Sequence, residues 1–230
     1  MELIRNESLE KELLREIDDS MYDGDRAQPS VSGMIYCLTK TYYGSEMTTA
    51  NEDGVKREQH NDEQIMLFIT GLGLEKTLLS GRQISEGGEY EGIQWHLDHF
   101  GTDGRFMEVK STRGSSNSSD DISEGWRKQI LAYFKVKGIT EGDLTILHLM
   151  GNYKPPFPQL RCWNIQSTQQ EVDDNWNWIK DRAQIYKNFV DAGSPPTPFK
   201  FNMDFECRYC NWKGLCDARS TLANMGARTI

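Results

Sequence analysis

The sequence predicts an α/β protein in which a central mixed sheet is flanked by helices. Stretches with helical periodicity alternate along the chain with pairs of short stretches rich in β-branched and aromatic residues. The resulting order is helix, two strands, helix, two strands, helix. Clusters of glycine, serine and proline separate these stretches. We expect residues 1–230 to form a single domain, because that length is ordinary for one.

Helical patterns predict five helices. The first three lie at 7–19, after Ser32 as an N-cap through Leu38, and from about Asp53 to Leu79. The last two lie at 125–138 and 168–192. Strand patterns predict four strands, which lie at 90–100, 105–112, 143–151 and 159–166. The turn residues at 101–104 predict that the first two strands form a hairpin.

The net charge is −9, so a DNA-binding surface would have to come from a local cluster of Lys and Arg. The chain has 6 Trp, 9 Tyr and 9 Phe, enough to build a core and to disfavour disorder. No run approaches the roughly 20 apolar residues of a membrane span, and the acidic N-terminal segment has no signal-peptide core. We therefore expect a cytoplasmic protein without a membrane partner.

The predicted hairpin carries a group of charged residues. A register centred on Asp103 places Asp98 opposite Glu108 and His96 opposite Lys110, with all four side chains on one face. Two facing carboxylates repel each other unless a cation lies between them. Mg²⁺ and Mn²⁺ take oxygen ligands, so Asp98 and Glu108 are candidate ligands of such an ion. Lys110 is then placed to hold the attacking water.

Each of these patterns also has a plain structural interpretation. A Glu-x-Lys sequence occurs by chance on many solvated strand faces. Gln129 and Tyr133 share one helix face and could contact DNA, or could belong to an ordinary helix surface with a partly buried Tyr. Glu75 is a lone carboxylate on an apolar helix, and a charge at a helix end explains it equally well.

Three of the five cysteines form a C-x₂-C-x₅-C pattern at Cys207, Cys210 and Cys216. Such close spacing favours a metal site over three buried free thiols. Cys37 is the candidate for a fourth ligand, whereas Cys162 alternates within a strand and is expected to be a packed core thiol. Four thiolates suit zinc and an iron–sulfur cluster equally well.

The joint order of these motifs resembles the RecB-like PD-(D/E)XK nucleases that carry an iron–sulfur cluster, in particular the CRISPR-associated RecB-family exonucleases (the fourth Cas protein). In that family one cysteine precedes the nuclease motifs and three follow them as C-x₂-C-x₅-C, as in this chain. The resemblance covers about residues 30–220. It implies a restriction-endonuclease-like fold.

The resemblance also implies a role for each motif. A [4Fe-4S] cluster would join the N- and C-terminal segments through Cys37, Cys207, Cys210 and Cys216. Mg²⁺ or Mn²⁺ would be held by Asp98, Glu108 and the Val109 carbonyl, Lys110 would serve the water, and Gln129 and Tyr133 would position substrate. The family usually has a His where this chain has Glu75, which makes Glu75 a candidate replacement ligand.

The implied function is metal-dependent DNA exonuclease activity on single-stranded ends, in CRISPR spacer acquisition or phage-type recombination. DNA and CRISPR integrase proteins are the implied partners. One alternative is a non-catalytic DNA- or protein-binding module stapled by an iron–sulfur or zinc site. Another is a zinc-stapled α/β protein of unrelated function. The presence of Asp98, Glu108 and Lys110 together favours the nuclease.

Overall fold

The computed structural model describes residues 7–20, 28–46, 62–79, 86–101, 104–117, 122–197 and 204–226. Its helices are α1 (Glu7–Ser20), α2 (Val31–Ile35), α3 (Leu38–Glu46), α4 (Asp62–Leu78), α5 (Glu124–Lys137), α6 (Gln169–Asp191), α7 (Asp204–Arg208) and α8 (Lys213–Gly226). Its strands are β1 (Glu86–Tyr90), β2 (Ile93–Leu97), β3 (His99–Phe100), β4 (Phe106–Thr112), β5 (Glu141–His148) and β6 (Gln159–Gln166).

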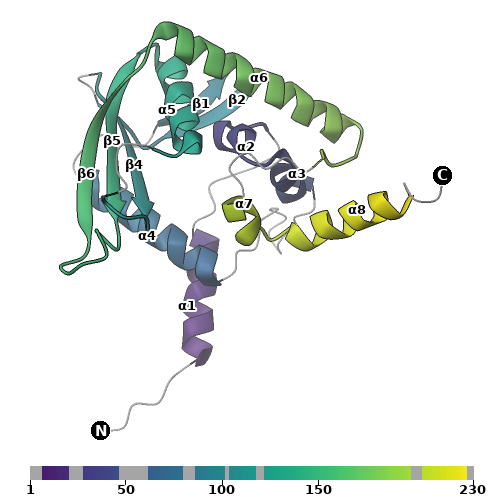
Figure 1. The fold of residues 1–230 in the computed structure, drawn as a ribbon, viewed down its shortest axis with the longest axis horizontal. Helices are drawn as coiled ribbons and strands as arrows, with labels where there is room; N and C mark the ends of the chain where they lie inside the picture. The colour runs from purple at the N-terminus through teal and green to yellow at the C-terminus, as the bar shows by residue number, and fades with distance from the viewer. Residues whose placement is uncertain are drawn as a thin grey trace.

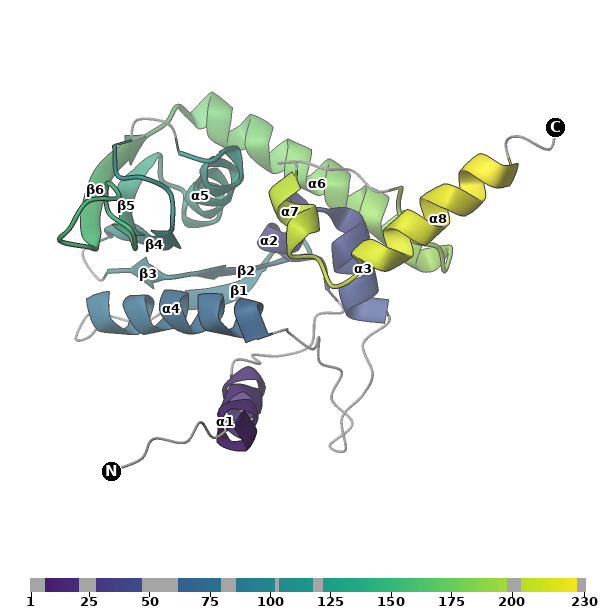
Figure 2. The same cartoon turned by 60° about the horizontal axis from the view of Figure 1, so that its bottom comes forward.

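The mixed α/β architecture predicted from the sequence is confirmed. A four-stranded sheet has the order β3-β4-β5-β6, with β4 and β5 parallel and both outer pairs antiparallel. Helix α5 connects the two parallel strands and packs against α6 (Figure 1). On the other side α4 contacts β4 and runs along β1, β2 and β3 (Figure 2). The sheet is therefore flanked by helices on both sides.

The predicted strand at 90–100 is wrong in one respect, because it is two strands in two sheets. Glu91 and Gly92 both have positive φ, 49° and 76°, and form a tight turn that folds β1 back on β2. The chain leaves that pairing at Leu97 and joins β4 only at His99 and Phe100. Those two pairs keep the predicted register, but His96 lies in the β1–β2 hairpin and not opposite Lys110.

The N-terminal helix assignment also needs correction. Ser30, not Ser32, caps α2, and its Oγ accepts a hydrogen bond from the backbone N of Gly33 at 3.2 Å. This helix ends at Ile35, and Cys37 lies between α2 and α3 rather than inside one helix. The buried guanidinium of Arg182 on α6 donates to the carbonyl oxygens of Met34 and Tyr36 and so fixes the break. Carbonyls at a helix end need such donors.

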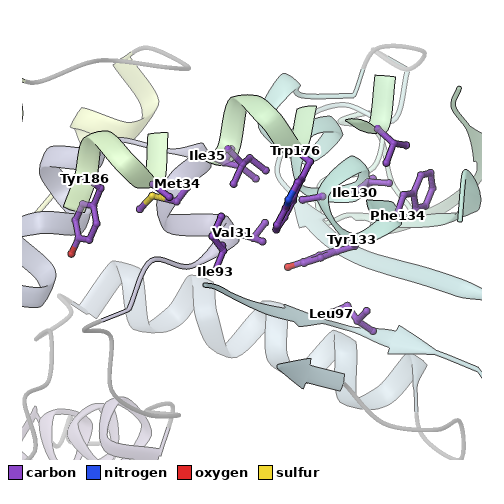
Figure 3. Packing of buried hydrophobic residues seen from close by; sticks show 14 of the residues in the cluster. Val31, Met34, Ile35, Ile93, Leu97, Ile130, Tyr133, Phe134, Trp176 and Tyr186 are labelled. Carbon is purple, nitrogen blue, oxygen red and sulfur yellow. The ribbon is translucent and has the colours of Figure 1, made fainter. Parts of the chain in front are cut away.

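The hydrophobic core lies between the sheet and helices α2, α5 and α6. Figure 3 shows Trp176 of α6 beside Val31 and Ile35 of α2, with Ile130 and Tyr133 of α5 nearby. Among the described residues, no helix combines the length and the apolar character that crossing a membrane requires.

Cys162 is exposed, and its predicted place in the core is wrong. It lies on β6, an outer strand of the sheet, where Leu160, Arg161 and Cys162 are all exposed. Its Sγ lies 3.5 Å from the Oγ1 of Thr145 on β5. A strand pattern in the sequence does not tell which face of an outer strand meets solvent.

Two glycines test the packing of this core. A Cβ on Gly142 of β5 would lie 2.5 Å from Cδ1 of Phe106 and 3.1 Å from Cε1 of Phe134. Gly142→Ala should lower the free energy of unfolding by about 1–3 kcal/mol, because overpacking forces neighbours off their rotamers. A Cβ on Gly73 of α4 meets nothing within 4 Å. Gly73→Ala should therefore raise stability by about 0.5–1 kcal/mol.

Urea unfolding of both variants and the parent measures the two changes. Equal effects of the same sign at the two positions would contradict the described packing around β5.

Candidate active site

The candidate site begins where β3 stops pairing with β4. Beyond Met107, no strand among the described residues lies beside the edge of β4 that faces away from β5. There the Asp98 side chain makes a hydrogen bond that a neighbouring strand would otherwise make. Its Oδ2 accepts from the backbone N of Val109 at 2.8 Å. In an extended strand the N–H and C=O of one residue point to the same edge. The Val109 carbonyl therefore faces the same edge as Asp98, as a shared role in holding a cation requires.

Glu108 is a fully buried carboxylate at the centre of the site. Its exposed fraction is 0%, and its Oε1 lies 2.5 Å from Nζ of Lys110 on the same face of β4. Its second oxygen, Oε2, is buried with no hydrogen-bond partner among the described residues. Burial raises the pKa of Glu108 to about 8, against the opposing effect of Lys110. A buried acceptor without a partner usually marks a missing ion or water.

Glu75 of α4 faces the same region. Burial raises its pKa, the negative charge of Asp98 raises it further, and His96 and Lys110 oppose both effects. Asp98 and Glu75 also raise the pKa of Glu108. Glu75 thus lies in the same region as Asp98 and Glu108. A ligand that replaces the usual His would have to lie there.

The donor chemistry of this group fits a hard divalent cation. Three carboxylates lie within electrostatic reach of one another, and one buried oxygen lacks a partner. A cation would relieve both the repulsion and the missing contact. Within the described part of the chain, no three His, Cys, Asp or Glu side chains already stand as a metal-ligand group. Small side-chain adjustments would have to accompany binding.

Gln129 and Tyr133 lie together on α5, and Nε2 of Gln129 donates to the Tyr133 hydroxyl at 2.8 Å. Tyr133 is only 3% exposed and its ring packs near Phe106. Burial raises the pKa of Tyr133 well above its ordinary value, and the charge of Glu108 adds to the effect. This pair therefore lines the buried side of Glu108, with Gln129 as the less buried member.

Tyr36 is a site residue that the sequence analysis missed. Burial raises its pKa, Lys110 opposes this, and the charges of Glu206 and Glu108 add to it. Its ring packs over Gly125 at the start of α5, where a Cβ would lie 2.9 Å from the Tyr36 hydroxyl oxygen. A glycine near a helix start and a tyrosine before a cysteine are both common, so the sequence holds no pattern that would have paired them.

The cysteines from the two ends of the chain lie in one region. The backbone N of Cys37 donates to Oε2 of Glu206 at 2.9 Å, which places the start of α3 against α7. Burial raises the pKa values of Cys210 and Cys216, and in both cases the charges of Cys37 and Cys207 raise them further. Cys37 and Cys207 thus lie within electrostatic range of both Cys210 and Cys216, and Cys162 does not act on either.

The thiol group has the donors of a metal centre. All four cysteines are free, and neighbouring thiolates repel one another unless a cation compensates their charge. Trp212, two residues after Cys210, has a buried indole N–H with no partner in the described structure. Its ring lies 5.8 Å from that of Tyr43 and shields this region. A donor of this kind can hydrogen-bond to the sulfur atoms of a cluster.

No family model matches the chain, and no curated protein matches it by sequence. Among solved structures, the crystal structure of SSO0001 is similar over 92% of this chain and 97% of that one, with 15% identity and a TM-score of 0.57. The likeness shows a shared fold.

Two further structures are more distant. An alkaline exonuclease from Laribacter hongkongensis has 11% identity and a TM-score of 0.48, over 77% of this chain and 95% of that one. A phage related exonuclease from Haemophilus somnus 129PT has 13% identity and a TM-score of 0.45, over 76% and 98%. The function of this chain is therefore argued from its own site.

Because Glu108 is buried, we predict that the metal-free protein becomes less stable as the pH rises. Because folding raises the pKa of Glu108 from 4.5 to about 8, the folded state binds the proton more tightly than the unfolded state. This contribution is complete below about pH 4.5 and is lost as pH rises toward about 8. Burial lowers the pKa of Lys110, but Glu108 and Asp98 raise it above its ordinary value, so the ammonium stays charged in this window.

Urea unfolding in the presence of a chelator, at about pH 5, 6.5 and 8, measures the effect. The stability of the parent should fall relative to Glu108→Gln by up to about 1.4 kcal/mol per pH unit, because Gln carries no titrating proton. A difference between the two proteins that is constant with pH would contradict the assigned burial of Glu108.

Proposed function

We propose that this protein is a divalent-cation-dependent DNA nuclease. The observation that carries the proposal is Glu108, a fully buried carboxylate with one oxygen paired to Lys110 and the other without a partner. Burying an ionised carboxylate is expensive unless it is compensated. A core that needed only shape would hold an apolar side chain here, so the site is best explained by a ligand of positive charge.

Asp98, Glu108 and the Val109 carbonyl would hold Mg²⁺ or Mn²⁺, with Glu75 as a further ligand. Such an ion supplies charge stabilisation and a more acidic bound water. Lys110 keeps its proton beside Glu108 and presents a positive charge to a phosphate at the mouth of the site. Asp98 keeps the β4 edge in place through the N–H of Val109. Gln129 and Tyr36 border the same space and would orient the DNA strand.

The finer proposal is exonuclease activity on single-stranded DNA ends. The resemblance of the motif order to the RecB-like PD-(D/E)XK nucleases supports it. By the same resemblance we assign the protein to CRISPR spacer acquisition, with integrase proteins as partners, or to phage-type recombination. A [4Fe-4S] cluster on Cys37, Cys207, Cys210 and Cys216 belongs to the proposal, supported by the gathering of these thiols.

Cleavage should depend on the acidic group in a graded way. Glu108→Gln and Asp98→Asn keep the size of each side chain but remove a charged ligand, and both should abolish most activity. Lys110→Ala should slow cleavage by about 10²- to 10³-fold, the usual effect of losing one group that stabilises charge in the transition state. Glu75→Ala tests whether Glu75 is a metal ligand. Activity should fall if Glu75 holds the metal and should stay unchanged if Glu75 is only a charge on the helix.

The assay follows single- and double-stranded DNA labelled at the 5′ or the 3′ end, with Mn²⁺, which also reveals the polarity of cleavage. Glu89→Gln serves as the matched control, because Glu89 is an exposed carboxylate of the β1–β2 hairpin. A folded Glu108→Gln variant that cuts as fast as the parent would refute the site. A parent that binds DNA but never cuts it would favour the non-catalytic module.

Replacing any one of Cys37, Cys207, Cys210 or Cys216 by Ser should lower bound iron and acid-labile sulfide together. It should also lower the thermal midpoint of unfolding, because metal binding and folding are coupled. Cys162→Ser is the matched control, since this thiol is exposed on β6, and it should change neither quantity. If the parent protein bound zinc and no iron, the [4Fe-4S] assignment would be refuted in favour of a zinc site.

A further inference from the structure

The turn between β5 and β6 is bound to the segment that follows β4. The backbone N of Leu149 donates to the carbonyl of Thr112 at 2.8 Å, and the N of Ser116 donates to the carbonyl of Gly151 at 2.9 Å. The Ser116 hydroxyl, which is buried, also donates to Oε1 of Gln159 at 2.6 Å. These contacts hold residues 149–159 at the carboxyl end of the strand that carries Glu108 and Lys110.

This turn exposes an unusual amount of apolar surface. Tyr153 is 59% exposed and Phe157 is 43% exposed. Met150 and Leu160, at 40% and 44%, stand at the two ends of the same turn. Four large apolar side chains within so short a segment indicate an interaction surface rather than isolated exposure. We call these four residues the hairpin platform.

The charge around the hairpin platform is positive. Lys154 and Arg161 lie within or beside it, and Arg113 is exposed at the end of β4, where its carbonyl accepts a hydrogen bond from the Tyr153 hydroxyl at 3.1 Å. The sequence has no Asp or Glu from 144 to 170 or from 109 to 117. Asp120 and Asp121, which come next, lie outside the described residues. In a chain of net charge −9, this surface is suited to an anionic partner.

Tyr153 is held in an unfavourable backbone conformation. Its φ is 64°, in the left-handed region that a bulky residue rarely adopts. The turn hydrogen bond from its N to the carbonyl of Met150, at 2.8 Å, keeps it there. Asn or Gly would occupy this position at lower cost. The hydroxyl donates to the Arg113 carbonyl, while the ring stays 59% exposed and free to contact a partner.

We propose that the hairpin platform binds single-stranded nucleic acid, with bases stacked on Tyr153 and Phe157 and phosphates paired with Arg113, Lys154 and Arg161. Exposed rings interleaved with basic side chains are the pattern that unpaired strands recognise. A duplex keeps its bases stacked inside and offers the rings nothing equivalent. The inference rests on the proposed nuclease function and adds a binding surface for its single-stranded substrate beside the acidic site.

The short separation between Lys110 and Arg113 is compatible with one DNA strand contacting both the hairpin platform and the acidic group. Arg113 follows Lys110 by three residues, which is about 10 Å along an extended strand. The platform therefore lies close to the acidic group but shares no residue with it. Binding on the platform and cleavage at Glu108 can be measured separately.

Equilibrium binding of a fluorescent oligothymidylate, in the presence of a chelator so that no cleavage occurs, tests the proposal. Tyr153→Ala and Phe157→Ala should each raise Kd by about 5- to 150-fold, the usual effect of losing one stacked base. Binding of a blunt duplex of the same length should change far less. Ile185→Ala, an exposed apolar side chain of α6, is the matched control and should change neither.

Tyr153→Asn separates binding from folding. Asn tolerates the left-handed backbone but has no ring to stack, so this variant should unfold at the same or a higher temperature and still bind the oligothymidylate as weakly as Tyr153→Ala. A stability loss that matches the binding loss would give Tyr153 a structural role and overturn the proposal.

The basic residues are tested through salt dependence. Each phosphate contact contributes about 0.7 to the slope of log K against log salt for a single strand, so Lys154→Gln and Arg161→Gln should each reduce the slope by about that amount. Unchanged slopes, or platform variants that bind as tightly as the parent, would overturn the proposal. If the parent never cuts DNA but the platform variants still lose binding, the nuclease proposal fails and this one stands.

Discussion

The contact between Glu108 and Lys110 determines which side chains can surround it. Glu108 is fully buried on one face of β4 and Lys110 beside it is partly buried, and a buried charge needs well-ordered surroundings. Tyr133 closes one side and Tyr36 another, and Gly125 is needed because a larger residue would displace the Tyr36 ring. The apolar core under the sheet supplies the rigidity, and the unpaired edge of β4 supplies access.

The second constraint is closure of the chain. Cys37, near the start of the described chain, lies against Glu206 near its end, and Arg182 fixes the helix break that precedes this contact. Thr39 and Arg219 both donate to the carbonyl of Pro196, which adds a third segment to the same region. Contacts of such long sequence separation cost loop entropy, and a metal or disulfide link across them gains the most stability in theory. The gathered thiols are suited to that purpose.

The sequence was sufficient for the elements whose pattern is local. The helix at 169–191 follows a capping box at Thr168 and Glu171, and the helix at 124–137 ends at a left-handed Gly138. The division of the segment at 90–100 could not be foreseen, because a Glu-Gly turn carries less signal than Asn-Gly and the strand before it is mostly polar. The sequence order and strand alternation of Glu108 and Lys110 match the structure, whereas the predicted pairing of His96 with Lys110 does not. Tyr36 depends on packing between distant segments, which periodicity does not encode.

One consequence follows from the position of Tyr36. Its ring is confined between Gly125 and the acidic group, and its carbonyl is held by Arg182, while the next residue in the chain is Cys37. One peptide unit therefore separates the thiol region from the acidic group. A substitution that shifts the Tyr36 backbone would therefore act on the thiol region and on the acidic group together.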